Sequence, residues 1–532
     1  MQRLSRMRDR GTDLTRLDPQ TPVLIGVGEA SEVIDAANYR ARSAVELAAA
    51  AALAAVEDAG LDPSVVAGQL GTVAGVRQFE VSTPNATAPL GRSTNFPRSV
   101  AARLGAVPAR AVLEVAGGQG PQRLVNEFAG RIAAGEENLV LLVGAEAIST
   151  VRHFAGTAER PDFSETVEGS LEDRGLGLDG LTTTEESLYG LVGAPPRYAL
   201  LENARRARLG SAAADYRMVM GELLAPFTQV AAAHPHAAVR VGRTADDLAT
   251  PSARNRIVVD PYPRMMIARD QVNQGAAVLL TSARHARVLG VPPERWVFLH
   301  GHADLVERPI LERPDLDKSP AAVTSVAHAL DLAGTTIAEL ATIDLYSCFP
   351  IAVFAVTDAF GLSTADPRRL TVTGGLPFFG GPGNNYSMHA IAETVRQVRQ
   401  MPGAFGLVGA NGGFLSKYSV GIYSATPRAW RASDSARVHL SLPASRAVPR
   451  VGRADGNATV ETYTVWNGRD GDKRAVVIGR MQASGARFIA RGGDDDSAFT
   501  DYLQAPGPVD KPIVVKSTDD GNVAGPGLQG LQ

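Results

Sequence analysis

The stretch VAGGQGPQRLVN, from Val115 to Asn126, decides how the chain is interpreted. It continues the apolar run AVLEV, which begins at Ala111 and is typical of a buried strand. Glycines then interrupt the run before a helical pattern that extends to about Gly135. A strand, a glycine-rich turn and a helix in this order favour an α/β unit. The helix N-terminus would direct free N–H groups and a positive dipole toward the turn.

The same alternation surrounds this stretch. The segment TPVLIGVG indicates a buried strand, and the alanine-rich segment after it indicates a helix that ends at a glycine. Two more strands are expected before and after the quoted turn, which predicts a largely parallel sheet covered by helices. The ranges are Thr21 to Gly28 (strand), Ser43 to Gly60 (helix), Leu70 to Val76 (strand) and Asn138 to Ala147 (strand).

A second α/β block follows later in the chain and predicts a duplicated architecture. Its helices are expected at Pro350 to Phe360, where proline suits the first turn, and at Met388 to Val398. Its strands are expected in the apolar segments at 296–305, 342–348, 405–413 and 416–424.

The chain changes character between the two blocks, at about 151–253. This region is polar, with helical patches at Tyr198 to Arg208 and Ala213 to Leu223. It indicates an inserted subdomain, and long insertions after a strand end commonly contact ligands. The cluster of Arg205, Arg206 and Arg208 predicts a solvated helix face, with phosphate binding as the alternative.

After Ala425 the segments VHLSL, ATVETYTVWNG and RAVVIGRMQ alternate apolar and polar residues between Gly, Asp and Asn turns. They predict a small antiparallel barrel of about 80 residues with a hairpin at WNGRDGDKR. The expected units are a disordered leader at 1–20, a first half at 21–290 containing the insertion, a second half at 291–425, a barrel at 426–509 and a flexible tail at 510–532.

Composition limits the function classes. The chain has 532 residues, enough for two to four domains, and a formal net charge of -3, which favours neither nucleic acid nor an anionic membrane. The single cysteine, Cys348, excludes an intramolecular disulfide and a cysteine-rich metal site. No apolar run of about 18 residues occurs, so no membrane span is expected. The start, MQRLSRMRDR, lacks the apolar core of a secretory signal, and we expect a cytoplasmic protein.

Five segments resemble the thiolase superfamily, especially its sterol-carrier-protein-type and actinobacterial thiolase-like branches. Thiolases place a nucleophilic cysteine at a strand-to-helix elbow, three residues before a glycine and five before a glutamine. Gly120 and Gln122 match these markers, so Gly117 stands in the place of the cysteine. The backbone donors of the elbow would remain, but a covalent acyl-enzyme could not form at Gly117. The alternative is a glycine turn that only packs helix on strand.

The segment YSCF, from Tyr346 to Phe349, resembles the HDCF and NEAF segments of the superfamily. Tyr346 replaces the His or Asn that helps bind the substrate oxygen. Cys348 matches a structural cysteine of the family, which predicts a buried, inert thiol. The functional alternative is a thiolate at the N-terminus of the helix that begins at Pro350.

The remaining matches lie in GGPGNN, GANGG and VNQGAAVLL. Gly381 stands where the family has the histidine of its GHP tripeptide. Ala410, followed by Asn411, stands where it has the cysteine of its CxGG stretch. The segment from Val272 to Leu280 resembles the N-D-G-A-A strand entry. The resemblance spans about Thr21 to Ser424.

The resemblance implies a duplicated thiolase fold with αβαβα layers, an inserted loop subdomain and an OB-like C-terminal β-barrel. It implies a protein of the acetyl-CoA acetyltransferase class that binds or acts on a CoA thioester in lipid or steroid metabolism. Because glycine or alanine replaces the usual nucleophile and bases, whether it is an enzyme stays open. The expected binding residues are Gly117, Gly120, Gly381, Ala410 and Asn411.

Two alternatives remain at this point. A retro-aldol C–C lyase acting on a β-hydroxyacyl-CoA would use Tyr346 as acid/base, with His389 assisting and Tyr262 as a weaker candidate. A non-catalytic acyl-CoA or lipid-binding scaffold would need none of these groups. The ligand would be an acyl-CoA or lipid that is not bound covalently, no metal site is expected, and either a homodimer or a monomer is compatible.

Overall fold

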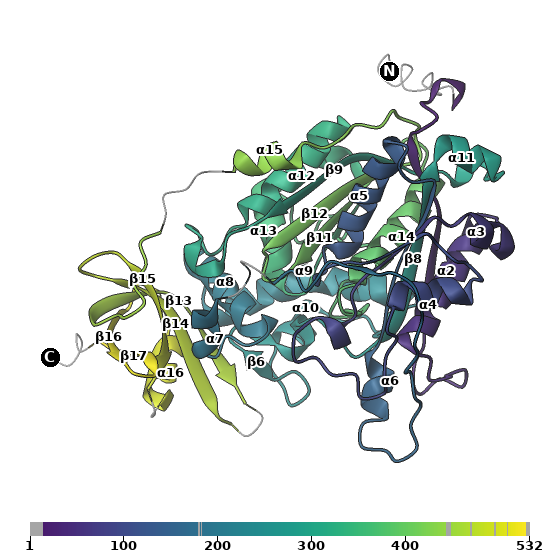
Figure 1. The fold of residues 1–532 in the computed structure, drawn as a ribbon. Coiled ribbons are helices and arrows are strands. Elements are labelled where there is room, and N and C mark those ends of the chain that lie inside the picture. Colours follow the sequence, from purple (N-terminus) through teal and green to yellow (C-terminus); the bar gives the residue numbers. More distant parts are fainter. Residues whose placement is uncertain are drawn as a thin grey trace.

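The computed structural model describes residues 14–178, 181, 183–442, 448–468, 471–493, 496–507 and 509–527. Figure 1 shows two α/β halves side by side and a smaller β-rich unit next to them. No helix in these residues is long and apolar enough to cross a membrane.

The first half is built on a mixed six-stranded sheet. The strands β2, β3, β4 and β5 run parallel, whereas β8 runs antiparallel to both β1 and β4. In spatial order the strands are β1 (Pro22–Ser31), β8 (Asn273–Ser282), β4 (Leu139–Ala147), β2 (Thr72–Gly75), β3 (Arg110–Leu113) and β5 (Glu172–Asp173).

The second half contains a four-stranded mixed sheet. Strands β10 and β11 are parallel, and β12 pairs antiparallel with both β11 and β9. In spatial order they are β10 (Leu340–Leu345), β11 (Phe405–Gly412), β12 (Lys417–Ser424) and β9 (Phe298–Val306).

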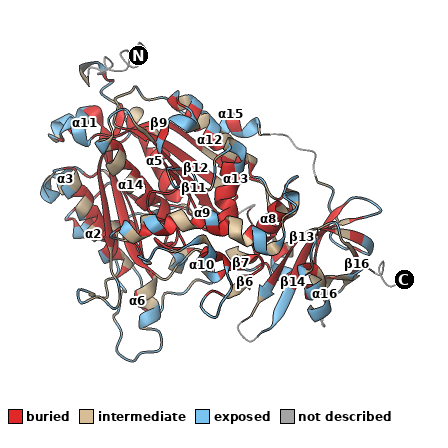
Figure 2. Ribbon diagram, turned by 180° about the vertical axis from the view of Figure 1, so that it is seen from behind, coloured by how far each residue is buried: buried red, intermediate tan, exposed pale blue. Residues whose placement is uncertain are grey.

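Helices form the other layers. Helices α5 (Gly120–Ala133) and α14 (Tyr386–Gln400) lie between the two sheets and contact strands of both. The outer face of the first sheet is covered by α2 (Ala44–Asp58), and that of the second by α12 (Pro320–Ala333). Figure 2 shows that burial is concentrated in the sheets and in the helices between them. The predicted αβαβα order is therefore confirmed. The further helices of the two halves are α3 (Pro63–Gln69), α4 (Phe96–Arg103), α11 (Ala283–Val288) and α13 (Pro350–Phe360).

The packing of α2 on β1 follows from the sequence. Ser43 and Glu46 form a capping box that begins the helix. A Cβ atom on Gly26 would overlap Ala55 O, so only glycine lets the helix backbone approach the strand this closely.

The insertion is helical mainly from Thr184 onward, whereas the described residues between His153 and Thr184 are mostly exposed loop. It contains α6 (Ile148–His153), α7 (Thr184–Leu188), α8 (Ala194–Arg208), α9 (Ala213–Ala233) and α10 (Ala245–Ala249), followed by strands β6 (Ile257–Val259) and β7 (Tyr262–Pro263). The prediction of a solvated arginine face on α8 is wrong for Arg205 and Arg206, which are buried, whereas Arg208 is exposed and pairs with Asp317 and Asp358. Arg205 pairs with Asp358, and the Arg206 guanidinium donates to the Tyr463 hydroxyl at 2.5 Å. These partners also leave the phosphate-binding alternative without support.

The C-terminal unit is a five-stranded barrel. Its strands follow the order β14, β15, β17, β16, β13, and the pairing of β13 with β14 closes it. The edge of β13 also pairs with β6, through Trp466 and Val259, and so joins the barrel to the insertion. The elements are β13 (Gly456–Asn467), β14 (Lys473–Met481), β15 (Arg487–Gly492), α16 (Asp496–Gln504), β16 (Pro512–Thr518) and β17 (Gly521–Pro526).

Two expectations for this region are wrong. The segment VHLSL is no strand but lies largely in helix α15 (Ser435–Leu440), where Asp434 caps the N-terminus and Val438 is buried. The expected tail contributes β16 and β17, because its alternating Ile513 and Val515 are buried in the barrel. Within the expected leader, residues 1–13 lie outside the described residues, and Leu17 is buried against the first half.

Candidate active site

The turn between β3 and α5 adopts the geometry expected of the elbow. Gly117 has a φ of +136°, a left-handed conformation that favours glycine. Gly120 is the first residue of α5, and its N–H donates to Gly117 O at 2.9 Å. The N–H of Gly117 donates to Asn384 Oδ1 at 2.9 Å. The GGPGNN loop, which contains Gly381, therefore lies directly against the elbow.

The end of β11 and Tyr346 meet at the same place. A Cβ atom on Gly412 would overlap Gln119 Oε1 and would lie 3.2 Å from Gly118 N. A Cβ atom on Gly118 would overlap the Tyr346 hydroxyl. Ala410 is buried in β11, two residues before Gly412. Segments far apart in the sequence thus converge on the N-terminus of α5.

A buried amide group without partners lies at the elbow, and two more lie in the segments that adjoin it. Gln119 is 2% exposed, and neither its Oε1 nor its Nε2 has a hydrogen-bond partner in the described part of the chain. The Oδ1 atoms of Asn385 and Asn411 are likewise buried and unpartnered among the described residues. Asn411 donates from Nδ2 to the Tyr198 hydroxyl at 2.8 Å, and Asn385 donates to Gly144 O at 2.7 Å. Such groups are rare in folded proteins because a missing partner is unfavourable by about 1–3 kcal/mol.

Tyr346 is poorly suited to act as a base. Burial raises the pKa of Tyr346 well above its usual value, with a smaller contribution from Cys348. Its ring packs edge-on against Tyr386, with centroids 5.4 Å apart. The hydroxyl therefore keeps its proton at neutral pH and is able to donate a hydrogen bond toward the elbow.

Cys348 has the properties of an inert thiol. Burial raises its pKa to about 12. The N-terminus of α13 is occupied by another group, because the N–H of Ile351 donates to Glu202 Oε2 at 2.7 Å. The Tyr262 hydroxyl also donates to this carboxylate, at 2.8 Å, so Tyr262 has the contacts of a packing residue. Burial raises the pKa of Glu202 to about 7.

His389 faces a different set of groups. Its Nδ1 lies 2.6 Å from Glu29 Oε1, and its ring packs against Phe379 with centroids 5.0 Å apart. Phe379 also contacts Tyr386, the neighbour of Tyr346. His389 therefore interacts with Glu29 of β1 and with the ring of Phe379, and in the described part of the chain no hydrogen bond joins it to the elbow.

The sequence reasoning did not single out Gln119, Asn384 or Lys417. Lys417, at the start of β12, donates from Nζ to Ala116 O at 3.1 Å and to Gly177 O at 2.6 Å. Burial lowers the pKa of Lys417 to about 8. Gln119 stands within the quoted elbow and Asn384 within GGPGNN, so position in these segments was the available signal. No such signal in the sequence pointed to Lys417.

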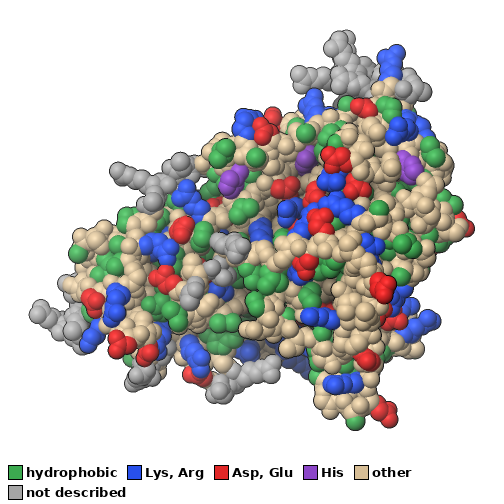
Figure 3. Space-filling view, viewed as in Figure 1, with side chains coloured by type: hydrophobic (Ala, Val, Ile, Leu, Met, Phe, Trp, Pro, Cys, Tyr) green, Lys and Arg blue, Asp and Glu red, His purple; other side chains and the backbone are tan. Residues whose placement is uncertain are grey.

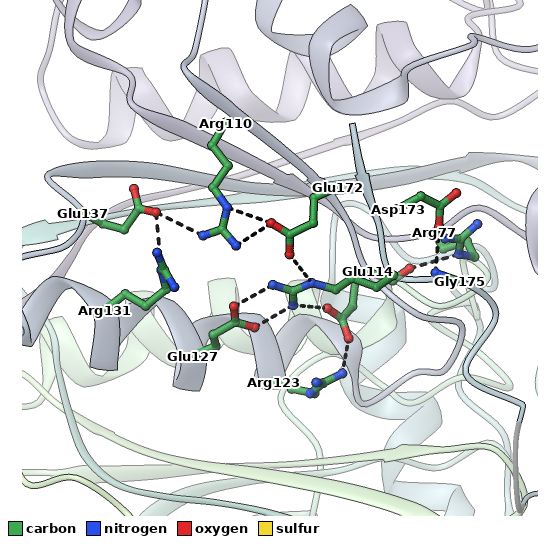
Figure 4. Close-up of polar contacts among 11 residues, drawn as sticks. Arg77, Arg110, Glu114, Arg123, Glu127, Arg131, Glu137, Glu172, Asp173 and Gly175 are labelled. Carbon is green, nitrogen blue, oxygen red and sulfur yellow. Dashed lines mark hydrogen bonds and ion pairs between the residues drawn. The ribbon is translucent and has the colours of Figure 1, made fainter. Parts of the chain in front are cut away.

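A network of ion pairs supports the elbow from outside (Figure 4). Glu114, fully buried just before the turn, pairs with Arg123 at 2.5 Å and with Arg174 at 2.7 Å. Arg174 also pairs with Glu127 of α5 and with Glu172 of β5. Figure 3 shows positive and negative side chains interleaved on the surface over α5. The network fastens β5 along the outer edge of β3.

A cavity of about 810 Å³ lies next to Arg77, a hydrogen-bond partner of Asn384. Asn384 donates from Nδ2 to Arg77 O at 2.7 Å, and Arg77 and Leu113 line the cavity. Glu146 is buried at its wall, and burial raises the pKa of this carboxyl well above its usual value. The volume of this cavity falls within the range of about 300–1,000 Å³ that is typical of small-molecule sites.

Comparisons with known proteins agree with this architecture. Residues 438–505 match the family model of the thiolase-like protein type 1 additional C-terminal domain. The crystal structure of a monomeric SCP2-thiolase-like protein type 1 from Mycobacterium smegmatis is 46% identical, with a TM-score of 0.82, over 96% of this chain and 100% of that one.

More distant relatives share the fold. A 3-ketoacyl-CoA thiolase of Erwinia tasmaniensis (strain DSM 17950 / CFBP 7177 / CIP 109463 / NCPPB 4357 / Et1/99) is 31% identical over 149 residues, 25% of this chain and only 32% of that relative. The Ltp2-ChsH2(DUF35) aldolase is 20% identical, with a TM-score of 0.54 over 77% of this chain and 99% of that one. Human mitochondrial 3-ketoacyl-CoA thiolase is 15% identical, with a TM-score of 0.54 over 77% and 100%.

Proposed function

Because the chain belongs to the SCP2-thiolase-like protein type 1 family of the thiolase superfamily, we propose that it binds a CoA thioester at the turn between β3 and α5, without forming an acyl-enzyme. The observation that carries the proposal is the buried, unpartnered amide of Gln119 at the N-terminus of α5. A thioester carbonyl would accept a hydrogen bond from Gln119 Nε2, where the helix dipole also favours negative charge on the oxygen.

The neighbouring groups support a binding role. Tyr346 would add a second donor, because its hydroxyl lies against Gly118 and keeps its proton. Gly381, Ala410 and Gly120 would leave room for close approach, since none carries a large side chain.

No covalent step is proposed, because the elbow holds no nucleophile. Cys348 is the only cysteine, and its raised pKa together with its burial opposes the reactive thiolate. His389 is bound to Glu29 and is proposed as a structural residue, in place of an assisting base.

A retro-aldol lyase is the second candidate. It needs a base for the β-hydroxyl, a role that the raised pKa of Tyr346 disfavours. Lys417 fits the role better, because it lies beside Ala116 and its pKa is lowered to about 8. In this reaction Lys417 would take the hydroxyl proton, and the Cα–Cβ bond would break to give a carbonyl compound and an enolate whose oxygen is held by Gln119 and Tyr346. The proton would then return from Lys417 to Cα of the enolate, which gives the shortened acyl-CoA.

We also propose that the chain is a monomer. Thiolases usually pair through the sheet edge of the first half, and here β5 lies along β3 at the end of that sheet, held by Arg174 and its carboxylate partners. The relative from Mycobacterium smegmatis is described as monomeric.

Calorimetry with CoA, acetyl-CoA and a long-chain acyl-CoA tests the binding proposal. We expect a thioester to bind at least about tenfold more tightly than CoA, and Gln119→Met to abolish this preference because methionine has the length of glutamine but no donor. Gln69→Met, at an exposed position at the end of α3, is the control. Equal affinity for CoA and its thioesters, or an unchanged preference in Gln119→Met, would contradict the assignment.

Product analysis separates binding from lyase activity. Incubation with a β-hydroxyacyl-CoA followed by mass spectrometry is expected to return the compound intact. Cleavage that is lost in Lys417→Met would establish the second candidate instead.

A further inference from the structure

A second cluster of polar side chains lies where three elements meet. Glu29 comes from the end of β1, Glu393 from α14, and His234 from the loop that follows α9. His236 lies nearby, with its Nδ1 2.9 Å from Ser31 Oγ. The elements are far apart in the sequence, so folding alone brings these side chains together.

The geometry of the cluster is that of a metal site. One ligand atom each of Glu29, His234 and Glu393 lies within 4.8 Å of the others. His234 Nε2 lies 3.9 Å from Glu393 Oε2. The His234 side chain is 6% exposed, and its Nε2 has no hydrogen-bond partner among the residues that the structure describes. This buried nitrogen lies beside two carboxylates and lacks a partner of its own, which fits a bound cation. His234 Nδ1 accepts a hydrogen bond from His236 N at 3.3 Å, so the neutral imidazole carries its proton on Nε2 and would have to release it when an ion binds there.

We propose that Glu29, His234 and Glu393 bind one divalent transition-metal ion, with Zn²⁺ as the best match to the ligand types. Zn²⁺ accepts both imidazole nitrogen and carboxylate oxygen as ligands, and zinc sites with three protein ligands keep a fourth position for water. Small shifts of the Glu29 and Glu393 side chains would bring the ligands to bonding distance, about 2.0–2.2 Å.

The residues around the cluster fit an outer shell. His389 Nδ1 lies 2.6 Å from Glu29 Oε1, and Gln397 donates to Glu393 Oε1 at 2.9 Å. Hydrogen-bonded ligands of this kind are a common feature of metal sites. Arg396 pairs with both carboxylates and would have to leave Glu29 when the ion binds. Its side chain is 33% exposed, so it is able to turn toward solvent.

The ion would connect the insertion to the elbow region. The segment after His234 pairs with the chain before GGPGNN, because Ala238 N donates to Phe379 O at 2.8 Å. Gln274 reinforces this contact by donating to both His236 O and Phe379 O. An ion held at His234 would therefore fix the loop that carries Gly381 and Asn384, without touching the ligand.

The test uses the full chain after chelator treatment. Calorimetric titration with Zn²⁺ is expected to show one equivalent bound per chain, and Co²⁺ is expected to give the visible absorption of a four-coordinate site. His234→Ala and Glu393→Gln are each expected to weaken Zn²⁺ binding by about tenfold or more. His439→Ala, at an exposed histidine of α15, controls for surface binding and is expected to change nothing.

Three outcomes would overturn the proposal. They are a lack of saturable Zn²⁺ binding, binding that Mg²⁺ reproduces, and Zn²⁺ binding that Glu393→Gln leaves unchanged. Should His234→Ala fail to fold, Glu393→Gln decides alone, since glutamine keeps the shape of the side chain. Because the readout is metal binding, the result is independent of whether the elbow binds a CoA thioester.

Discussion

The side-chain amide of Gln119 occupies the space that a side chain at Gly117 would need: a Cβ atom on Gly117 would overlap Gln119 Oε1. The place of the family's nucleophile is thus filled by a polar group that has no partner in the described part of the chain. In the proposed function, Nε2 of the same amide would act as a hydrogen-bond donor where the family has a nucleophile.

The unpartnered amide of Gln119 should therefore lower the stability of the free protein, although it contributes to ligand binding. Gln119→Met removes a buried amide without partners while keeping the side-chain length. We expect the free energy of unfolding of the free protein to rise by about 1 kcal/mol. Urea denaturation of both proteins measures the change. A variant that is less stable than the parent would mean that the amide is already satisfied in the free protein.

Gly117 and Gly381 should respond differently to substitution. Gly117→Ala forces a non-glycine residue into φ +136° and against Gln119, so we expect destabilisation of about 1–3 kcal/mol. Gly381→Ala should change stability by less than about 1 kcal/mol, because its Cβ would lie 3.3 Å from Leu376 Cδ2 and its φ is not in the left-handed region. Thermal or urea unfolding compares the two; equal effects would contradict the geometry of the elbow.

Restoring a cysteine should not restore thiolase chemistry. Gly117→Cys faces the same overlap, and in place of the family's histidine stands Gly381. Intact-mass measurement after incubation with acetyl-CoA should show no acyl adduct on the parent, on Gly117→Cys or on Cys348→Ala. An adduct on the parent that Cys348→Ala removes would identify Cys348 as a relocated nucleophile.

Glu202 should make stability fall as pH rises. Its folded pKa, about 7, lies above the value of about 4.5 for the unfolded chain, so the folded state holds a proton that the unfolded state releases. The contribution of Glu202 to stability is then greatest below about pH 4.5 and declines by up to roughly 1.4 kcal/mol per pH unit until about pH 7. Glu202→Gln should flatten this slope. Urea unfolding at about pH 5 and about pH 7.5 tests it, and parallel slopes would contradict it.

The ion pairs at the edge of the first sheet should differ in strength. Arg174→Met removes one of two partners of the buried Glu114, and we expect a loss of about 2 kcal/mol, below the full effect of an unpaired buried charge because Arg123 remains. Arg103→Met breaks a partly exposed pair with Glu165 and should lose less than about 1 kcal/mol. Urea unfolding measures both, and equal losses would show that burial of Glu114 has no effect.

The position of β5 along β3, at the edge of the first sheet, also predicts the oligomeric state. Light scattering on the purified chain should give the monomer mass of 55.8 kDa. A mass of twice this value would mean that β5 does not prevent pairing of the sheets.

Local sequence was sufficient for most of the fold. Helix α13 begins at Pro350 and ends at Phe360 as predicted, because proline suits the first turn and Gly361 adopts the left-handed C-cap. The elbow was also predictable, since an apolar strand, a glycine turn and a helical pattern adjoin there. The substitutions of the family's catalytic groups by Gly117, Gly381 and Ala410 follow from the sequence alone.

Local sequence failed where distant partners decide the structure. The segment from Val438 alternates like a strand, but Val438 packs against Leu305 and Ala321, and Asp434 caps a helix instead. The glycine-rich end of the chain forms β16 and β17 because β13 and β15 supply their hydrogen bonds.

The sequence by itself determined the two α/β halves, the barrel and the absence of a nucleophile, because each depends on residues adjacent in the chain. Tertiary structure alone decided that Gln119 fills the elbow, that His389 faces Glu29 and that His234 meets Glu393. Glu29 and His389 are separated by 360 positions, and no local pattern specifies such a contact. The physical reason is that hydrogen-bond partners, and the low dielectric that shifts a pKa, exist only after distant segments have packed together.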